Sequence, residues 1–103
     1  MAKAGLAQEA IGYCDKSLML FPDGDMALEA RAVAYLKLND YAHAIADCDA
    51  ALRIDPQRSY SLFARGVAKL KSGDKTGDAD IRAARQVYAG VDYDLKDAGI
   101  TPP

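Results

Sequence analysis

The residues that could carry catalytic or metal chemistry are few in this chain of 103 residues. His43 is the only histidine, and no cysteine or second histidine stands beside it, as a zinc site would require. The two cysteines, Cys14 and Cys48, do not form the pattern of a disulfide framework. A paired nucleophile and general base is not evident. The sequence therefore predicts a non-catalytic protein with no metal and no cofactor.

Residues 73–77 and the nearby aspartates are typical in part of ligand-binding loops. The segment Gly-Asp-Lys-Thr-Gly has the residue types of a phosphate-binding loop, but that loop needs Gly-Lys-Ser/Thr directly after a strand. Asp74 interrupts the pattern, and its charge would repel phosphate. Asp74, Asp78 and Asp80 lack the ligand spacing and the final glutamate of a calcium loop. We interpret them as turn residues and as carboxylates that a helix N-terminus favours.

The elements that would position these residues repeat every 34 residues. AIGYCDKSLMLFPDGD, from Ala10, aligns with AIADCDAALRIDPQRS, from Ala44. Cys14 and Cys48 occupy the same point of the two copies, and packed helices would hold them about 10 Å apart, too far for a disulfide. We expect both to be small buried hydrophobes. A third copy follows, and its offset falls to 33 beyond Asp74.

The apolar spacing of each unit predicts two helices. Leu28, Ala32, Tyr35 and Leu36 recur at intervals of three and four residues, and residues 44–52 follow the same rule. The expected helices span residues 5–20, 25–38, 41–54, 59–72 and 76–88, with a short last helix from 92 to about 98.

Turn residues separate these helices. Asn39 tolerates the left-handed conformation that ends a helix, and Asp40 can cap the next one. Gly73 and Asp74 are expected to repeat that arrangement 34 residues later. Pro56 ends a unit, because proline cannot continue a helix.

The stretch EARAVAYLKLNDYAHAIADCDAALRIDP resembles a tetratricopeptide repeat (TPR) throughout. Small, aromatic and proline residues stand at the signature points of that family, namely Ala32, Tyr35, Ala44, Ala51 and Pro56. The copy SLFARGVAKLKSGDKTGDADIRAAR resembles the closing repeat of bacterial TPR proteins, with Lys69 in place of the aromatic residue and Gly77 in place of alanine. The resemblance covers residues 5–88. It implies an all-α, right-handed superhelical array of antiparallel helix–turn–helix hairpins, with five main helices and a short capping helix.

On this basis residues 1–103 are expected to be a single TPR domain. It would comprise the second helix of a truncated repeat (5–20), a full repeat (23–56), a closing repeat (57–88) and a capping helix (91–100). Two interpretations of the truncated repeat compete: the C-terminal piece of a longer protein, or a short native chain that starts with a lone helix. In either case, helix 5–20 lacks a partner on one side, so we expect a tendency to form homodimers through it.

The resemblance also implies a protein partner, because the first helix of each TPR hairpin lines a concave face. The groove positions carried over are Met26, Glu29, Val33, Leu36, Lys37, Tyr60, Phe63, Val67, Leu70 and Lys71. Such a mainly apolar stripe suits a peptide or an amphipathic helix. Contact with the chain's own tail, or simple core packing, are the alternatives for the same stripe. A structural unit for homo-oligomerisation, or for docking within a larger parent protein, is the alternative function.

Three function classes are disfavoured by composition and by single residues. The net charge of −2, with acidic and basic residues interleaved, gives no attraction to nucleic acid or anionic lipid. No apolar run reaches membrane-spanning length, and no signal pattern is present, so a cytoplasmic protein is expected unless the chain is a fragment. Glu29, Val33 and Ala64 stand where chaperone-binding TPR proteins hold a terminal carboxylate, and an acid with two apolar groups cannot do so.

Overall fold

The computed structural model describes residues 2–103, with side chains from Gly5 onward. Over this range the chain forms six helices and no strand. They are α1 (Ala2–Leu20), α2 (Asp25–Lys37), α3 (Tyr41–Ile54), α4 (Ser59–Lys71), α5 (Gly77–Val87) and α6 (Val91–Asp97). The predicted all-α array of helical hairpins is confirmed.

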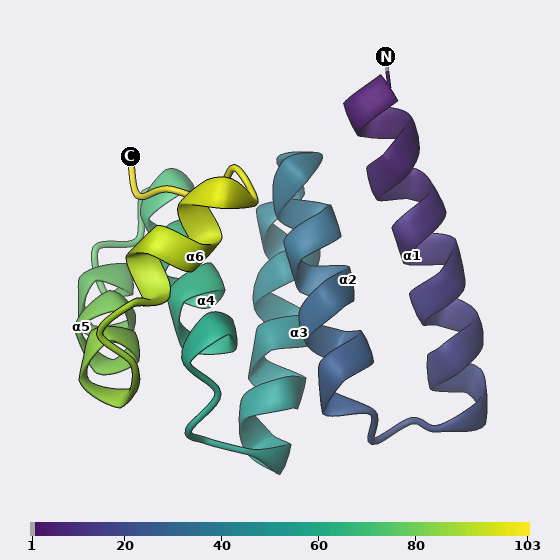
Figure 1. Ribbon diagram of the computed structural model, residues 1–103, viewed down its shortest axis with the longest axis horizontal. Helices are drawn as coiled ribbons and strands as arrows, with labels where there is room; N and C mark the ends of the chain where they lie inside the picture. The colour runs from purple at the N-terminus through teal and green to yellow at the C-terminus, as the bar shows by residue number, and fades with distance from the viewer. Residues whose placement is uncertain (1) are drawn as a thin grey trace.

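Successive helices pack side by side in chain order (Figure 1). The first helices of neighbouring hairpins, α2 and α4, also contact each other. The short helix α6 lies against both α4 and α5 at one end of the array. At the other end α1 packs only against α2 within the described part of the chain. The array therefore has one covered end and one open end.

The turns explain where the helices stop. Asn39 has a φ of 59°, and the carboxylate of Asp40 accepts a hydrogen bond from the His43 backbone N–H at 3.3 Å. Both roles predicted for the first turn are confirmed. In the second turn Gly73 has the expected positive φ of 91°. The carboxylate of Asp74, however, accepts hydrogen bonds only from Thr76, so the predicted cap of α5 by Asp74 is wrong.

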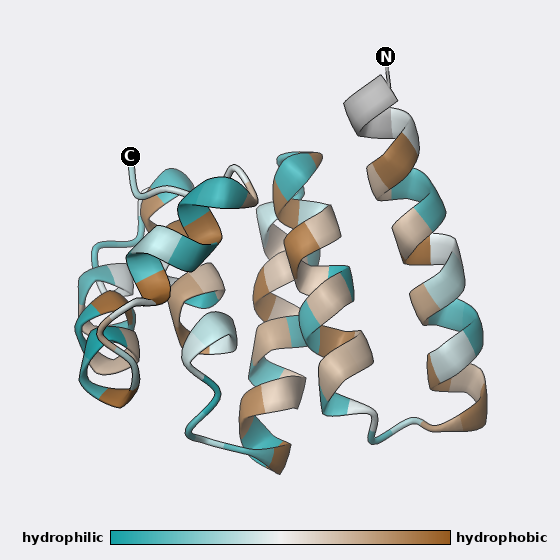
Figure 2. Ribbon diagram, in the orientation of Figure 1, coloured by the Kyte–Doolittle hydropathy of each residue, from teal (hydrophilic) through white to brown (hydrophobic). Residues whose placement is uncertain are grey.

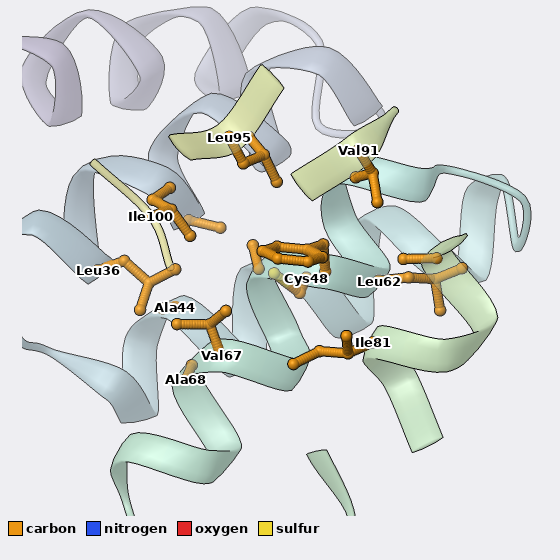
Figure 3. Close-up of a cluster of buried hydrophobic side chains, with 14 of the residues drawn as sticks. Leu36, Ala44, Cys48, Leu62, Val67, Ala68, Ile81, Val91, Leu95 and Ile100 are labelled. Carbon is orange, nitrogen blue, oxygen red and sulfur yellow. The ribbon is translucent and has the colours of Figure 1, made fainter. Parts of the chain in front are cut away.

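Helix α4 runs through the centre of the core. Val67 and Ala68 on this helix lie among Leu36, Cys48 and Ile81 of its neighbours (Figure 3). Burial raises the pKa of the Cys48 thiol, which therefore stays protonated and packs as an apolar group.

Cys14 occupies the same repeat position in α1 but is only partly buried. The prediction of two buried cysteines holds for Cys48 and fails for Cys14, because fewer helices surround α1 than surround α3.

Two glycines allow α4 and α5 to approach closely. A Cβ atom added to Gly66 would lie 2.7 Å from the carbonyl oxygen of Gly77 and equally close to the Ile81 side chain. Gly77 faces Gly66 across the same crossing, and neither position has room for a side chain. The departure of Gly77 from the family's alanine thus fits the geometry of the closing hairpin.

A repeated ion-pair cluster joins three helices at a time. The Arg31 guanidinium of α2 donates to both carboxylate oxygens of Asp47 on α3, at 2.7 and 2.8 Å, and to Asp15 on α1 at 2.9 Å. Thirty-four residues later, Arg65 of α4 donates in the same way to Asp80 and to Asp49. We call each set an arginine clamp. The planar guanidinium suits this role because it bonds one carboxylate with two N–H groups and still reaches a second carboxylate.

Candidate interaction surface

The predicted stripe on α4 is covered by the chain itself. Phe63 and Val67 have 0% of their surface exposed, and both belong to the same core cluster as Val91, Leu95 and Ile100. Figure 3 shows these last three side chains above Val67, on α6 and the tail that follows it. The expectation that Phe63 and Val67 line an open groove is therefore wrong. Leu70 is partly buried and packs against this cluster, and Lys71 remains exposed beyond it.

The turn after α6 directs the tail back into the core. Gly99 has a φ of 81°, a conformation that glycine adopts without strain. The backbone N–H of Gly99 donates to the carbonyl of Lys96, and that of Ile100 donates to the carbonyl of Leu95. This is the Schellman arrangement, in which an apolar residue after the glycine contacts the last turn of the helix. Ile100 is 3% exposed as a result.

Tyr60 is also engaged with α6. Its hydroxyl donates a hydrogen bond to the carboxylate of Asp94, which raises the pKa of Tyr60 to about 12. The ring of Tyr60 lies 6.4 Å from that of Tyr88, centroid to centroid. A polar contact thus fixes the start of α4 to α6, beside the apolar contacts of Leu95.

The predicted positions on α2 have different surroundings. Met26 is 73% exposed, and Lys37 is exposed at the far end of the helix. Glu29 accepts hydrogen bonds from Arg58 Nε at 3.0 Å and from Ser61 Oγ at 2.9 Å, so it serves the contact between α2 and α4. The hydrogen bond to Glu29 raises the pKa of the Arg58 guanidinium. Glu29 is therefore committed within the fold, whereas the rest of the stripe remains to be placed.

Val33, Leu36 and Lys37 line a cleft of about 510 Å³. The cleft lies between the N-terminal half of α1, the C-terminal half of α2 and the end of α6, and its floor is mainly apolar. Its lining residues are Leu6, Ala7, Ala10, Ala30, Val33, Ala34, Leu36, Lys37, Asn39, Lys71, Asp97, Ala98 and Gly99. A volume of this size falls in the range of ligand pockets.

The sequence reasoning missed the two walls of this cleft, which come from α1 and from the end of α6. The available signal was the repeat alignment. Ala30 and Val33 are repeat equivalents of Ala64 and Val67, which α6 helps to bury. No described helix lies over α2 in the equivalent place, and the cleft is the space that results.

The tetratricopeptide repeat family model matches residues 26–58, which run from the first turn of α2 to the residue before α4. The chain carries a tetratricopeptide repeat. TPR units are protein-interaction scaffolds in general, and the matched TPR unit includes the part of the stripe that faces the cleft. A comparison with curated protein sequences gives no match.

The residues with chemical potential have structural contacts outside the cleft. The His43 ring lies over Tyr35, with centroids 4.9 Å apart, and its Nδ1 is 2.7 Å from an Asp40 oxygen. Asp80 belongs to the Arg65 clamp. Across residues 2–103, none of the helices has the length and apolar character that a membrane span needs.

Proposed function

We propose that this TPR array is a non-catalytic scaffold that binds a peptide or an amphipathic helix of a partner protein in the cleft between α1, α2 and α6. The observation that carries the proposal is the open floor of the cleft. Ala30 is exposed and Val33 is half-buried, whereas their equivalents Ala64 and Val67 are fully buried. A helical ligand over α2 would bury the first pair as the second pair is buried.

Helix α6 indicates what such a ligand would present. It covers α4 with Val91 and Leu95, which are four residues apart and therefore on one face of the helix. Asp94 adds the single polar contact to Tyr60. A partner segment with two apolar residues at this spacing would suit the floor of the cleft in the same way.

The charges at the edge of the cleft are of both signs. Lys37 and Lys71 lie on one side, and Asp97 lies near them. The lysines could attract an acidic residue of the ligand, but exposed charges contribute little affinity, about 1 kcal/mol or less for each pair. We therefore assign recognition mainly to the apolar floor.

The test is affinity capture from a lysate of the source organism, with Ala30→Glu compared with wild type. Ala30 is exposed on a helix, so glutamate is compatible with folding and places a charge on the floor of the cleft. Ala46→Glu, on the exposed side of α3 outside the cleft, is the matched control. The proposal predicts that one protein is retained by wild type and by Ala46→Glu and lost by Ala30→Glu. Equal retention by all three proteins would contradict it.

A second candidate function is assembly, either as a homo-oligomer or by docking within a larger parent protein. The observation in its favour is the open end of the array, where α1 contacts only α2 among the described helices. Apolar colour recurs along α1 and continues into the turn that follows it (Figure 2). Met19, Leu20 and Phe21 at that turn are 68–82% exposed.

A further inference from the structure

One face of α1 lacks the cover that the equivalent face of α3 has. In α3 the buried residues are Ala44, Asp47, Cys48, Ala51 and Leu52. Their equivalents in α1 are Ala10, Tyr13, Cys14, Ser17 and Leu18, and every one of them is partly or largely exposed. Tyr13 alone is 72% exposed. The difference lies in the neighbours, because α3 contacts both α2 and α4, whereas α1 contacts only α2 in the described chain.

This face does not carry the acceptor that a further TPR helix would use. In both complete hairpins, an arginine of the first helix donates two hydrogen bonds to an aspartate of the second helix, Asp47 or Asp80. Tyr13 stands at that position in α1 and cannot accept a bidentate guanidinium. The face is therefore unlike the one that an arginine-clamped helix of the same repeat would cover.

The exposed face has instead a seven-residue pattern. Leu6, Tyr13 and Leu20 are 64–75% exposed and follow one another at intervals of seven residues, which places them along one line of the helix. Glu9 and Lys16, also seven apart and exposed, lie on one flank of that line. The smaller Ala10 and Ser17 lie on the other flank. Such a line of apolar residues with charges beside it is the pattern of a helix that packs against another helix.

We propose that α1 packs antiparallel against α1 of a second copy, about a two-fold axis near Tyr13. The pattern is symmetric about that point. Leu6 would meet Leu20 of the second copy, and Tyr13 would meet its own equivalent. Glu9 would face Lys16 of the second copy, and the two-fold axis would form this ion pair twice. A parallel pair would separate Glu9 and Lys16 by about 10 Å along the axis, at 1.5 Å per residue, and would lose both ion pairs.

This inference rests on the assembly candidate and is independent of peptide binding in the cleft. It uses Glu9, Tyr13, Lys16 and Leu20, and only Leu6 belongs to both surfaces. Because each copy contributes a single helix face, the buried area is small and the dimer is weak and concentration-dependent.

The test is sedimentation equilibrium of the full chain over roughly two orders of magnitude of protein concentration, since mass action then shifts a weak dimer visibly. Glu9→Lys or Lys16→Glu alone would replace two attractions by two repulsions and weaken the dimer about tenfold, at up to about 1 kcal/mol for each exposed pair. The double variant Glu9→Lys/Lys16→Glu restores opposite charges across the axis. We expect it to return the dissociation constant to within about threefold of wild type.

Lys75→Glu is the control, because it makes the same change in net charge at an exposed residue outside α1. It should leave the dimer unchanged, and circular dichroism should show equal helix content in all variants. A chain that remains monomeric throughout overturns both this inference and homo-oligomerisation. A dimer that ignores the single swaps, or that the double swap fails to restore, overturns the α1 interface and leaves assembly through another surface. Capture of a partner through the cleft should be the same for wild type and Lys16→Glu.

Discussion

Helices α2 and α4 stand at equivalent places of successive hairpins but have different neighbours. Over α4 lies α6, so Ala64 and Val67 are fully buried. Over the N-terminal side of α2 there is only the cleft wall of α1, and the equivalent Ala30 and Val33 remain accessible. The two helices share a repeat position, yet one is core and the other is surface. The repeat position thus specifies a helix and its direction, whereas the next helix along the array decides which side chains are available to a partner.

The largest difference between the two ends should appear when an aromatic side chain is truncated at each. Phe63→Ala removes a fully buried ring at the covered end and should lower the free energy of unfolding by about 3–5 kcal/mol. Tyr13→Ala removes an aromatic ring of which 72% is already exposed, so the free energy of unfolding should change by about 0.5 kcal/mol or less.

Urea denaturation at low protein concentration measures both changes without a contribution from self-association. Comparable losses from Phe63→Ala and Tyr13→Ala would mean that the two ends are equally well packed, contrary to the structure. Phe63→Glu would place a charge in the core, so it cannot serve as a probe of a groove that leaves the fold intact.

The first arginine clamp offers an intermediate contrast, because one guanidinium bonds both to the core hairpin and to α1. The Asp47 side chain is 8% exposed and accepts two hydrogen bonds from Arg31, whereas the Asp15 side chain is 53% exposed and accepts one. Asp47→Ala should cost about 2 kcal/mol, because it leaves a partly buried guanidinium without its main acceptor. Asp15→Ala should cost about 0.5 kcal/mol, as for an exposed ion pair.

Both substitutions replace aspartate by alanine within a helix, so the gain in helix propensity is similar and cancels in the comparison. Thermal and urea unfolding of the two variants would measure the difference. If Asp15→Ala were the more costly change, α1 would be held to the array more firmly than its contacts indicate.

The helices and their turns could be predicted from the sequence because they depend on neighbours within a few residues. The spacing of Leu28, Ala32 and Leu36 specifies a helix locally, and Asn39 specifies its end. The fate of Phe63 could not be predicted in this way. Its burial depends on a seven-residue helix about 30 residues later and on a glycine turn that returns Ile100 to the core.

The candidate site shows the same limit. The apolar stripe on α2 was found from its own spacing, but the walls of the cleft come from α1 and from the residues around Ala98. The repeat alignment paired Arg31 with Arg65, yet the acidic partners of these arginines belong to other helices and follow only from the packing. Tertiary contacts of this kind have no periodic signal in the sequence.

The smallest expected effect concerns the polar contact that fixes α6 over α4, and it should appear as a pH dependence. The hydrogen bond to Asp94 raises the pKa of Tyr60 from about 10 in the unfolded chain to about 12 in the folded one. Below pH 10 the phenol is protonated in both states, and its contribution to stability is fully present. As the pH rises from 10 to about 12, the unfolded chain loses this proton first, so the free energy of unfolding falls and the contribution is lost.

The measurement is urea unfolding of wild type and Tyr60→Phe at several pH values between 8 and about 11, below the alkaline end of the Tyr60 titration. Other tyrosines and the lysines titrate in both proteins, so the stability difference between the two isolates Tyr60. That difference should be constant up to about pH 10 and then shrink. A difference that stays constant through pH 11 would mean that Tyr60 keeps an ordinary pKa, and that α6 is held over α4 by Val91, Leu95 and Ile100 alone.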